Sequence, residues 1–313
     1  MKRTIRIGTR DSELALWQAN TVKNQLENFG YSTELVPVKS TGDLVLDKPL
    51  YEMGITGIFT KTLDVAMLNG AVDIAVHSMK DVPTQLPNGI VQTAVLERAS
   101  FEDILVAETE IDFEKLCTIA TGSLRRKAQW LNRYPNHTVV DLRGNVNTRL
   151  QKLKDNNWQG AIFAKAGLER LGFVFGEAIK SPSFGGVGEA LSWMLPAPAQ
   201  GAMVVVALEK DEFSIEATSK LNHTNSEICT EIEREFLRTL EGGCTAPIGA
   251  LAEIIDDEIL FKGCLFSLDG QNKLEIERFV SIENYKNFGK NCAEFLLQNG
   301  GSELMASIKK QMG

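Results

Sequence analysis

Short apolar runs alternate with helix-patterned segments over the first two thirds of this sequence, and no other feature restricts its fold as much. In the segments between the runs, apolar residues recur three and four positions apart, as in Ala15, Ala19 and Val22, which places them on one helical face. Strands that alternate with amphipathic helices predict an α/β fold with parallel sheets and helices on both faces. The expected strands are residues 4–8, 34–39, 72–77, 91–95, 103–107, 117–121, 138–142, 160–164 and 202–208.

The last hundred residues follow a different pattern. A helix is expected over 226–240, followed by strands near 247–255, 258–266 and 274–280 and then by helical segments. This order predicts a separate, small α+β domain. The Pro- and Gly-containing segment 196–201 predicts a turn and, as one interpretation, a hinge where the chain crosses between domains.

Composition narrows the class of protein. Of 313 residues, 43% are hydrophobic and 24% charged, which is typical of a globular protein. The longest apolar run, 202–208, is far shorter than the roughly 20 residues that cross a bilayer, and no apolar leader opens the sequence. We therefore expect a cytoplasmic protein without a membrane partner. The net charge of −8 argues against a protein that binds nucleic acid.

The cysteines and histidines predict no metal site. There are five cysteines, none in a Cys-x-x-Cys pair, and only three histidines. Neither a zinc site nor a disulfide framework is indicated by these counts.

Cations stand where the predicted strands lead into helices. Ligands of open α/β sheets bind beyond the carboxyl ends of the strands, so these junctions are the expected site. One arginine pair alone would be interpreted as solvated surface charge. Five cationic junctions instead predict a site for several anions between two lobes. The junctions carry Arg10, Lys80, Arg125 with Arg126, Arg143, and Lys165 with Arg170.

The third junction is the most informative. Ser123 is a good N-cap, which would place Arg125 and Arg126 in the first turn of a helix. A helix N-terminus is itself partly positive, so each cation there is unfavourable by about 0.3–1 kcal/mol. We therefore expect an anionic group to offset them, and the planar guanidinium suits a carboxylate or a phosphate.

Asp81 and Cys244 are the candidate reactive residues, and each has two interpretations. Asp81 follows Lys80 and is either its ion-pair partner or an ionised carboxylate that hydrogen-bonds a substrate N–H and stabilises positive charge there.

Cys244 follows Gly242-Gly243 at an expected helix end, where the helix dipole disfavours a thiolate. It suits an attachment point better than a nucleophile, and an inert loop thiol is the alternative.

Seven motifs, in order from residue 5 to residue 250, resemble those of the porphobilinogen deaminase (hydroxymethylbilane synthase) family. One such motif would be weak, but seven in order are very specific. They are Ile7–Leu16 (IGTRDSELAL), Val76–Pro83 (VHSMKDVP), Gly122–Arg126 (GSLRR), Leu142–Arg149 (LRGNVNTR), Gly167–Gly172 (GLERLG), Pro198–Ala202 (PAQGA) and Leu240–Gly249 (LEGGCTAPIG).

The resemblance implies two periplasmic-binding-protein-like α/β lobes with mixed or parallel sheets and a small C-terminal α+β domain that carries the cofactor cysteine. The expected domains are residues 1–97 with 199–219, residues 98–198, and residues 220–313. The implied activity is that of a monomeric transferase. It deaminates four porphobilinogen molecules, joins them head to tail onto a dipyrromethane cofactor held by a thioether to Cys244, and releases hydroxymethylbilane by hydrolysis.

The resemblance also assigns roles to single residues. Asp81 is the expected catalytic carboxylate, Phe59 the stacking aromatic residue, and Gln200 a residue at the hinge. One departure lies just before Phe59, where Ile55-Thr56-Gly57 replaces the usual Gly-Lys-Gly. The residues expected to bind substrate and cofactor carboxylates are Arg10, Ser12, Lys80, Thr121, Ser123, Arg125, Arg126, Arg143, Arg149 and Arg170.

A second function class stays open on the sequence alone. A non-catalytic, two-lobed binding protein for a small polycarboxylate would share the fold and the cations. It would have no use for Cys244, and it is the less favoured hypothesis.

Overall fold

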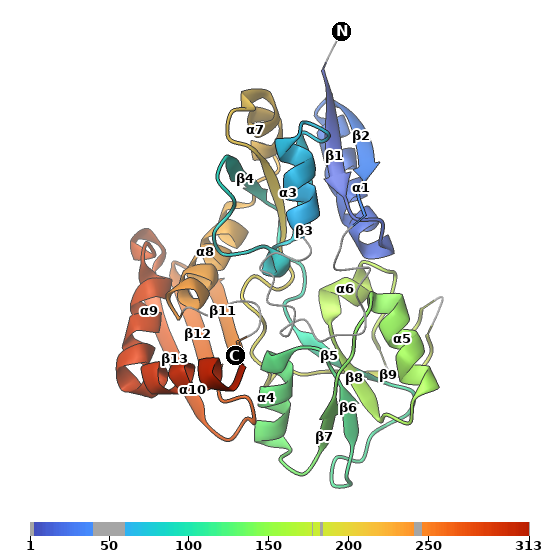
Figure 1. Cartoon of the computed structure of the whole chain (residues 1–313), viewed down its shortest axis with the longest axis vertical. Coiled ribbons are helices and arrows are strands. Elements are labelled where there is room, and N and C mark those ends of the chain that lie inside the picture. The colour runs from blue at the N-terminus through green and yellow to red at the C-terminus, as the bar shows by residue number, and fades with distance from the viewer. Residues whose placement is uncertain (1–2, 40–59, 177, 182–183, 241–245, 313) are drawn as a thin grey trace. The chain divides into compact units, whose positions relative to one another are not determined.

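The computed structural model describes residues 3–39, 60–176, 178–181, 184–240 and 246–312 (Figure 1). The described residues divide into two compact units. The first takes its residues from Met1–Val45, Ile55–Ala99 and Gly201–Ile228, and the second from Ser100–Gln200 and Cys229–Gly313. The expected division into three domains stays a prediction.

The first unit is built on a mixed sheet in the order β2-β1-β3-β10-β4. Strand β1 pairs in parallel with β2 and β3, whereas β10 runs antiparallel to β3 and β4. Ile5 and Ile7 of β1 are buried with Ala19, Val22 and Leu26 of α1, the helical face that the spacing predicts. The elements are β1 (Thr4–Thr9), α1 (Glu13–Asn28), β2 (Ser32–Pro37), α3 (Lys61–Leu68), β3 (Ile74–Ser78), the 3₁₀ helix η2 (Met79–Asp81), β4 (Ile90–Val95), β10 (Met203–Leu208) and α7 (Glu212–Ser219).

The second unit contains a mixed sheet in the order β7-β6-β8-β5-β9. Strands β6, β7 and β8 are parallel, and β5 runs antiparallel to β8. Leu105 and Ile162 from the sheet pack with Trp130 of α4 in one buried cluster. The elements are β5 (Asp103–Ala107), β6 (Thr118–Ala120), α4 (Leu124–Arg133), β7 (Thr138–Val140), α5 (Val146–Asp155), β8 (Gly160–Ala164), α6 (Lys165–Glu169) and β9 (Val187–Ala190).

The same unit holds a second, antiparallel sheet in the order β11-β12-β13. The ring of Phe236 in α8 meets that of Phe261 in β12 edge-on at 5.1 Å, and Gly263 gives Phe236 room, since a Cβ there would lie 2.7 Å from it. The elements are α8 (Thr224–Thr239), β11 (Ile248–Ile255), β12 (Glu258–Phe266), β13 (Lys273–Ser281), the 3₁₀ helix η3 (Ile282–Asn284), α9 (Phe288–Leu296), the kinked turn η4 (Leu297–Gly301) and α10 (Ser302–Met312).

The predicted fold class is confirmed: the described residues form two mixed sheets that pack with helices and, besides these, a C-terminal α+β part with its own sheet. Each of the expected strands is present, with its ends shifted by at most two residues. Strand β9 was not predicted, because four residues that include Gly188 give no apolar pattern. None of the helices in the described ranges combines the length and the apolar character needed to cross a membrane.

The segment just before β10 contains a strained residue held by a buried acid. Ala199 is fully buried and has φ = 62°, a left-handed conformation that is unfavourable for alanine. Its backbone N–H donates to Oε2 of Glu233 in α8 at 2.6 Å, and Oε1 of Glu233 accepts from the N–H of Ala252 in β11 at 2.8 Å. One buried carboxylate therefore ties this segment to the C-terminal sheet.

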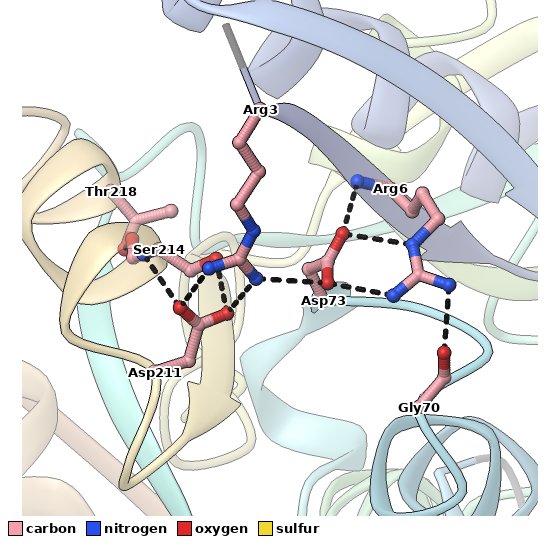
Figure 2. A network of polar contacts seen from close by, with 7 residues as sticks. All are labelled: Arg3, Arg6, Gly70, Asp73, Asp211, Ser214 and Thr218. Atoms are coloured by element: carbon pink, nitrogen blue, oxygen red, sulfur yellow. Dashed lines mark hydrogen bonds and ion pairs between the residues drawn. The ribbon is translucent and has the colours of Figure 1, made fainter. Parts of the chain in front are cut away.

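An ion-pair network joins the amino ends of β1 and β3 to the start of α7 (Figure 2). The Asp73 carboxylate accepts from Nη2 of Arg3 at 3.0 Å and from the backbone N–H, Nε and Nη2 of Arg6 at 2.8–3.0 Å. Arg3 also donates to both carboxylate oxygens of Asp211, which accepts from the Ser214 N–H at the start of α7. Burial raises the pKa of Asp73, but Arg6 and Arg3 outweigh this effect and hold the pKa below its ordinary value.

Asp73→Asn should lower the free energy of unfolding at pH 7 by about 1–2 kcal/mol, since charged hydrogen bonds contribute about 1.5–3 kcal/mol and solvent screens the half-exposed arginines. Because the folded pKa of Asp73 is depressed, its contribution is present above the unfolded pKa near 4 and is lost as the pH falls through the lower folded value. Urea unfolding from pH 7 to pH 3 tests this, with the exposed Asp112→Asn as the control. A wild-type advantage that does not shrink in acid would contradict the prediction.

Glu233→Ala should lower the free energy of unfolding by about 2–5 kcal/mol, because two buried N–H groups lose their acceptor at about 1–3 kcal/mol each. Glu231→Ala is the matched control on the same helix, since Glu231 is partly exposed and pairs with Lys286 at the surface. Equal unfolding midpoints for the two variants, measured by denaturant titration, would show that Glu233 does not hold the segment.

Candidate active site

In the first unit, the structure places four predicted site residues at one sheet edge. Arg10 and Ser12 follow β1, and Lys80 and Asp81 follow β3, its parallel neighbour, so both pairs lie beyond the same carboxyl ends. Ser12 caps α1 by accepting from the N–H of Ala15.

Two buried side chains lie behind this edge. Gln18 of α1 donates to the hydroxyl of Ser78 at the end of β3, at 2.8 Å. His77, one residue earlier, is buried, and its Nε2 has no hydrogen-bond partner in the described part of the chain. Burial, followed by the positive charge of Arg10, lowers the pKa of His77 to about 4, so this imidazole is neutral at physiological pH. The charge of Arg10 thus acts on the end of β3.

Asp81 ends the short helix η2 and is half-buried. Its carboxylate makes no hydrogen bond or ion pair with any residue that the structure describes, Lys80 included. The interpretation of Asp81 as the partner of Lys80 is therefore not supported. Its oxygens can accept hydrogen bonds, as a group that binds a ligand N–H requires.

In the second unit, the carboxyl ends of β6, β7 and β8 share another edge. Thr121 and Ser123 follow β6, and the Thr121 hydroxyl accepts from the Ser123 N–H. Arg143 follows β7, and burial lowers its pKa. Arg149, in α5, donates from Nε to the carbonyl of Gly144 at 2.7 Å.

The last junction of this edge follows β8. Lys165 pairs with Glu102 at 2.7 Å. Arg170, at the end of α6, is half-buried, and burial lowers its pKa to about 10. A bound anion stabilises a guanidinium that has lost part of its contact with water.

The prediction for α4 is confirmed in its local geometry. Ser123 is the N-cap and accepts from the Arg126 N–H, which places Arg125 and Arg126 in the first turn. Both are buried, and both pair with Asp103 at 2.7 Å. The anion expected beside these two arginines is thus in the first place an internal carboxylate, so binding of ligand carboxylates by this pair stays a prediction.

Gln200 is fully buried and belongs to the same cluster. Its side-chain amide donates to the Phe101 carbonyl and to Oδ1 of Asp103, each at 2.8 Å. Within this unit, the structure thus brings together three predicted residues, Gln200, Arg125 and Arg126, around one acid that was not predicted. The available signal was an aspartate that opens an otherwise apolar strand.

Two predicted residues, Phe59 and Cys244, lie outside the described residues. The other four cysteines are all buried. Burial raises the pKa of Cys264 to about 12 and that of Cys292 to about 11, so these thiols are poor nucleophiles.

The donors at both edges suit a ligand that carries several carboxylates, since guanidinium, ammonium and hydroxyl groups all bind carboxylate oxygens. No group of three or more His, Cys, Asp or Glu side chains that could hold a metal ion occurs among the described residues.

Comparison with known proteins identifies the family. The model of the porphobilinogen deaminase, dipyromethane cofactor binding domain matches residues 5–216, and that of the porphobilinogen deaminase C-terminal domain matches residues 227–298. The porphobilinogen deaminase of a Nitratiruptor species is 42% identical over 303 residues, covering 96% of this chain and 95% of the relative. That of Campylobacter hominis is 42% identical over 305 residues, covering 96% and 97%.

Among solved structures, the methionine binding protein MetQ is similar at 12% identity with a TM-score of 0.43, covering 70% of this chain and 89% of that protein. The two family models, over residues 5–216 and 227–298, and the near full-length relatives indicate the same family. The chain belongs to the porphobilinogen deaminase family.

Proposed function

We propose that this protein performs the reaction of its family with Asp81 as the catalytic carboxylate and Cys244 as the attachment point of the cofactor. The protein is a transferase that deaminates four porphobilinogen molecules, joins them head to tail and releases hydroxymethylbilane. One observation in the structure supports the role of Asp81 above others: its carboxylate has no partner among the described residues and stands at a sheet edge that carries cations.

The substrate explains the cations. Porphobilinogen carries an acetate and a propionate, so each added ring brings two negative charges that arginine and lysine can bind. In the first unit the proposed binding residues are Arg10, Ser12 and Lys80. In the second unit they are Thr121, Ser123, Arg125, Arg126, Arg143, Arg149, Arg170 and Gln200. Phe59 is proposed to stack on a pyrrole ring.

Asp81 can assist the loss of ammonia. As the C–N bond of the protonated aminomethyl group breaks, its electron pair leaves with ammonia, and the pyrrole nitrogen donates electrons to the carbon left behind. Positive charge then develops at the ring N–H. A carboxylate that accepts a hydrogen bond from this N–H stabilises that charge more in the transition state than in the substrate.

The family's dipyrromethane cofactor, when bound, supplies the pyrrole carbon to which the first unit is joined. Its acetate and propionate groups suit the same cationic edges. The Cys244 sulfur is proposed to hold it through a thioether, which is consistent with the burial of the other four cysteines.

Family membership favours this reaction over the alternative of a non-catalytic polycarboxylate-binding protein. We also propose that the protein acts as a monomer in the cytoplasm, with no nucleic-acid or membrane partner.

Intact-mass spectrometry tests the attachment point. The purified protein should exceed its sequence mass by two substrate-derived pyrrole units, and Cys244→Ser should lose this excess while Cys229→Ser keeps it. A protein of bare sequence mass that still converts porphobilinogen would refute the covalent cofactor, and the reverse result for the two variants would move its attachment site.

Asp81→Asn should reduce the turnover of porphobilinogen at least a hundredfold with the fold retained, because loss of one preorganised group that stabilises developing charge costs about 10²–10³ in rate. Glu97→Gln, an exposed acid just after β4 in the same unit, is the control and should stay within about twofold of wild type. Near-normal turnover by Asp81→Asn, measured as steady-state product formation, would remove Asp81 from the mechanism.

A further inference from the structure

Asp103 is a fully buried carboxylate that the proposed mechanism does not use. It is the first residue of β5, and it pairs in register with Ala164, the last residue of the antiparallel strand β8. Because β5 begins where β8 ends, Asp103 lies at the same sheet edge as the side chains that follow the carboxyl ends of the parallel strands.

Three side chains share this carboxylate. Oδ1 accepts from Nε of Arg126 at 3.0 Å, from Nη2 of Arg126 at 2.7 Å and from Nε2 of Gln200 at 2.8 Å. Oδ2 lies 2.7 Å from Nη1 of Arg125. All four residues are buried, Asp103 and Gln200 completely.

Two backbone carbonyls complete the arrangement. Nη1 of Arg126 donates to Ile162 in β8 at 2.9 Å, and Nη1 of Arg125 donates to Leu195 at 2.7 Å. Each guanidinium is thus fixed both to Asp103 and to the backbone of the unit. Ordering a long side chain before a ligand arrives removes that entropic cost from binding.

We propose that Asp103 is a positioning residue, which holds the guanidiniums of Arg125 and Arg126 and the amide of Gln200 in the one arrangement that receives a pyrrole carboxylate. This inference rests on the proposed function, because it takes the arginine pair as part of the binding site. It assigns no contact between Asp103 and the substrate.

The charge of Asp103 persists over the working pH range. Burial alone would raise the pKa of Asp103, but the charges of Arg125 and Arg126 outweigh it and hold the pKa below its ordinary value. The arrangement is therefore independent of pH near neutrality, which agrees with a fixed scaffold.

The kinetics of Asp103→Asn separate a positioning role from a counter-ion role. Loss of positioning should raise the KM for porphobilinogen at least tenfold. If Asp103 only neutralised charge, its removal would strengthen the attraction of the arginines for carboxylates and lower the KM. A lowered or unchanged KM in the folded variant overturns the proposal.

Asp73→Asn is the matched control, since Asp73 is also one carboxylate shared by two arginines, at the amino ends of β1 and β3. It should lose stability and keep the wild-type KM. If both variants change the KM alike, the effect reports general loosening, and the positioning role is refuted.

A second pair of variants tests the positioning role of Asp103 if Asp103→Asn does not fold. Arg125→Gln leaves the Arg126–Asp103 contacts in place, and Asp103→Asn combined with Arg125→Gln removes one charge of each sign, which limits the burial of unpaired charge. The double variant should have a kcat/KM at least tenfold below that of Arg125→Gln alone. Equal values overturn the proposal. Wild-type protein that fails to convert porphobilinogen would instead refute the proposed function.

Discussion

A carboxylate buried away from water is tolerated only when positive charges and hydrogen-bond donors contact it, and Asp103 imposes this constraint on the second unit. Arg125, Arg126 and Gln200 supply these contacts. Because Gln200 follows Ala199 directly, the same constraint reaches the strained segment that Glu233 holds from α8. Two buried acids thus determine the shape of this segment and of the start of α4.

The same grouping of one carboxylate and two arginines has a different effect in the first unit because water reaches it. The side chains of Arg3 and Arg6 are 45% and 38% exposed, whereas those paired with Asp103 are 5% and 7% exposed. Screening makes the exposed network a modest contribution to stability. Strand direction decides where the two acids lie. Asp73 precedes β3, which is parallel to β1, so it lies at the amino ends of both strands. Asp103 opens β5, which is antiparallel to β8, so it lies at the edge where β8 ends.

Local features of the fold could be predicted from the sequence, and strand direction could not. The strands follow from apolar runs, and Ser123 caps α4 because its side chain accepts an N–H of the next turn, a property of adjacent residues. The position of Asp103 beside α4 depends on β5 being antiparallel, which residues 103–107 do not encode by themselves. For the same reason, adjacent residues indicate a ligand for the arginine pair and do not reveal its internal partner, Asp103. The assignment of Phe59 depends on a motif match alone, and that of Cys244 on its motif and on its place after an expected helix end.

The net charge of a protein and the charges at its binding site affect a ligand at different distances. The −8 of the whole chain sets the field at long range, which salt screens over about 8–10 Å. A ligand carboxylate instead meets the groups within hydrogen-bond distance, and at both sheet edges these include guanidiniums. Some of the acids that make up the negative total pair with lysines at the surface, as Glu231 does with Lys286. An acidic protein can therefore bind a polyanion, provided that cations lie within reach of the ligand at the ends of its strands.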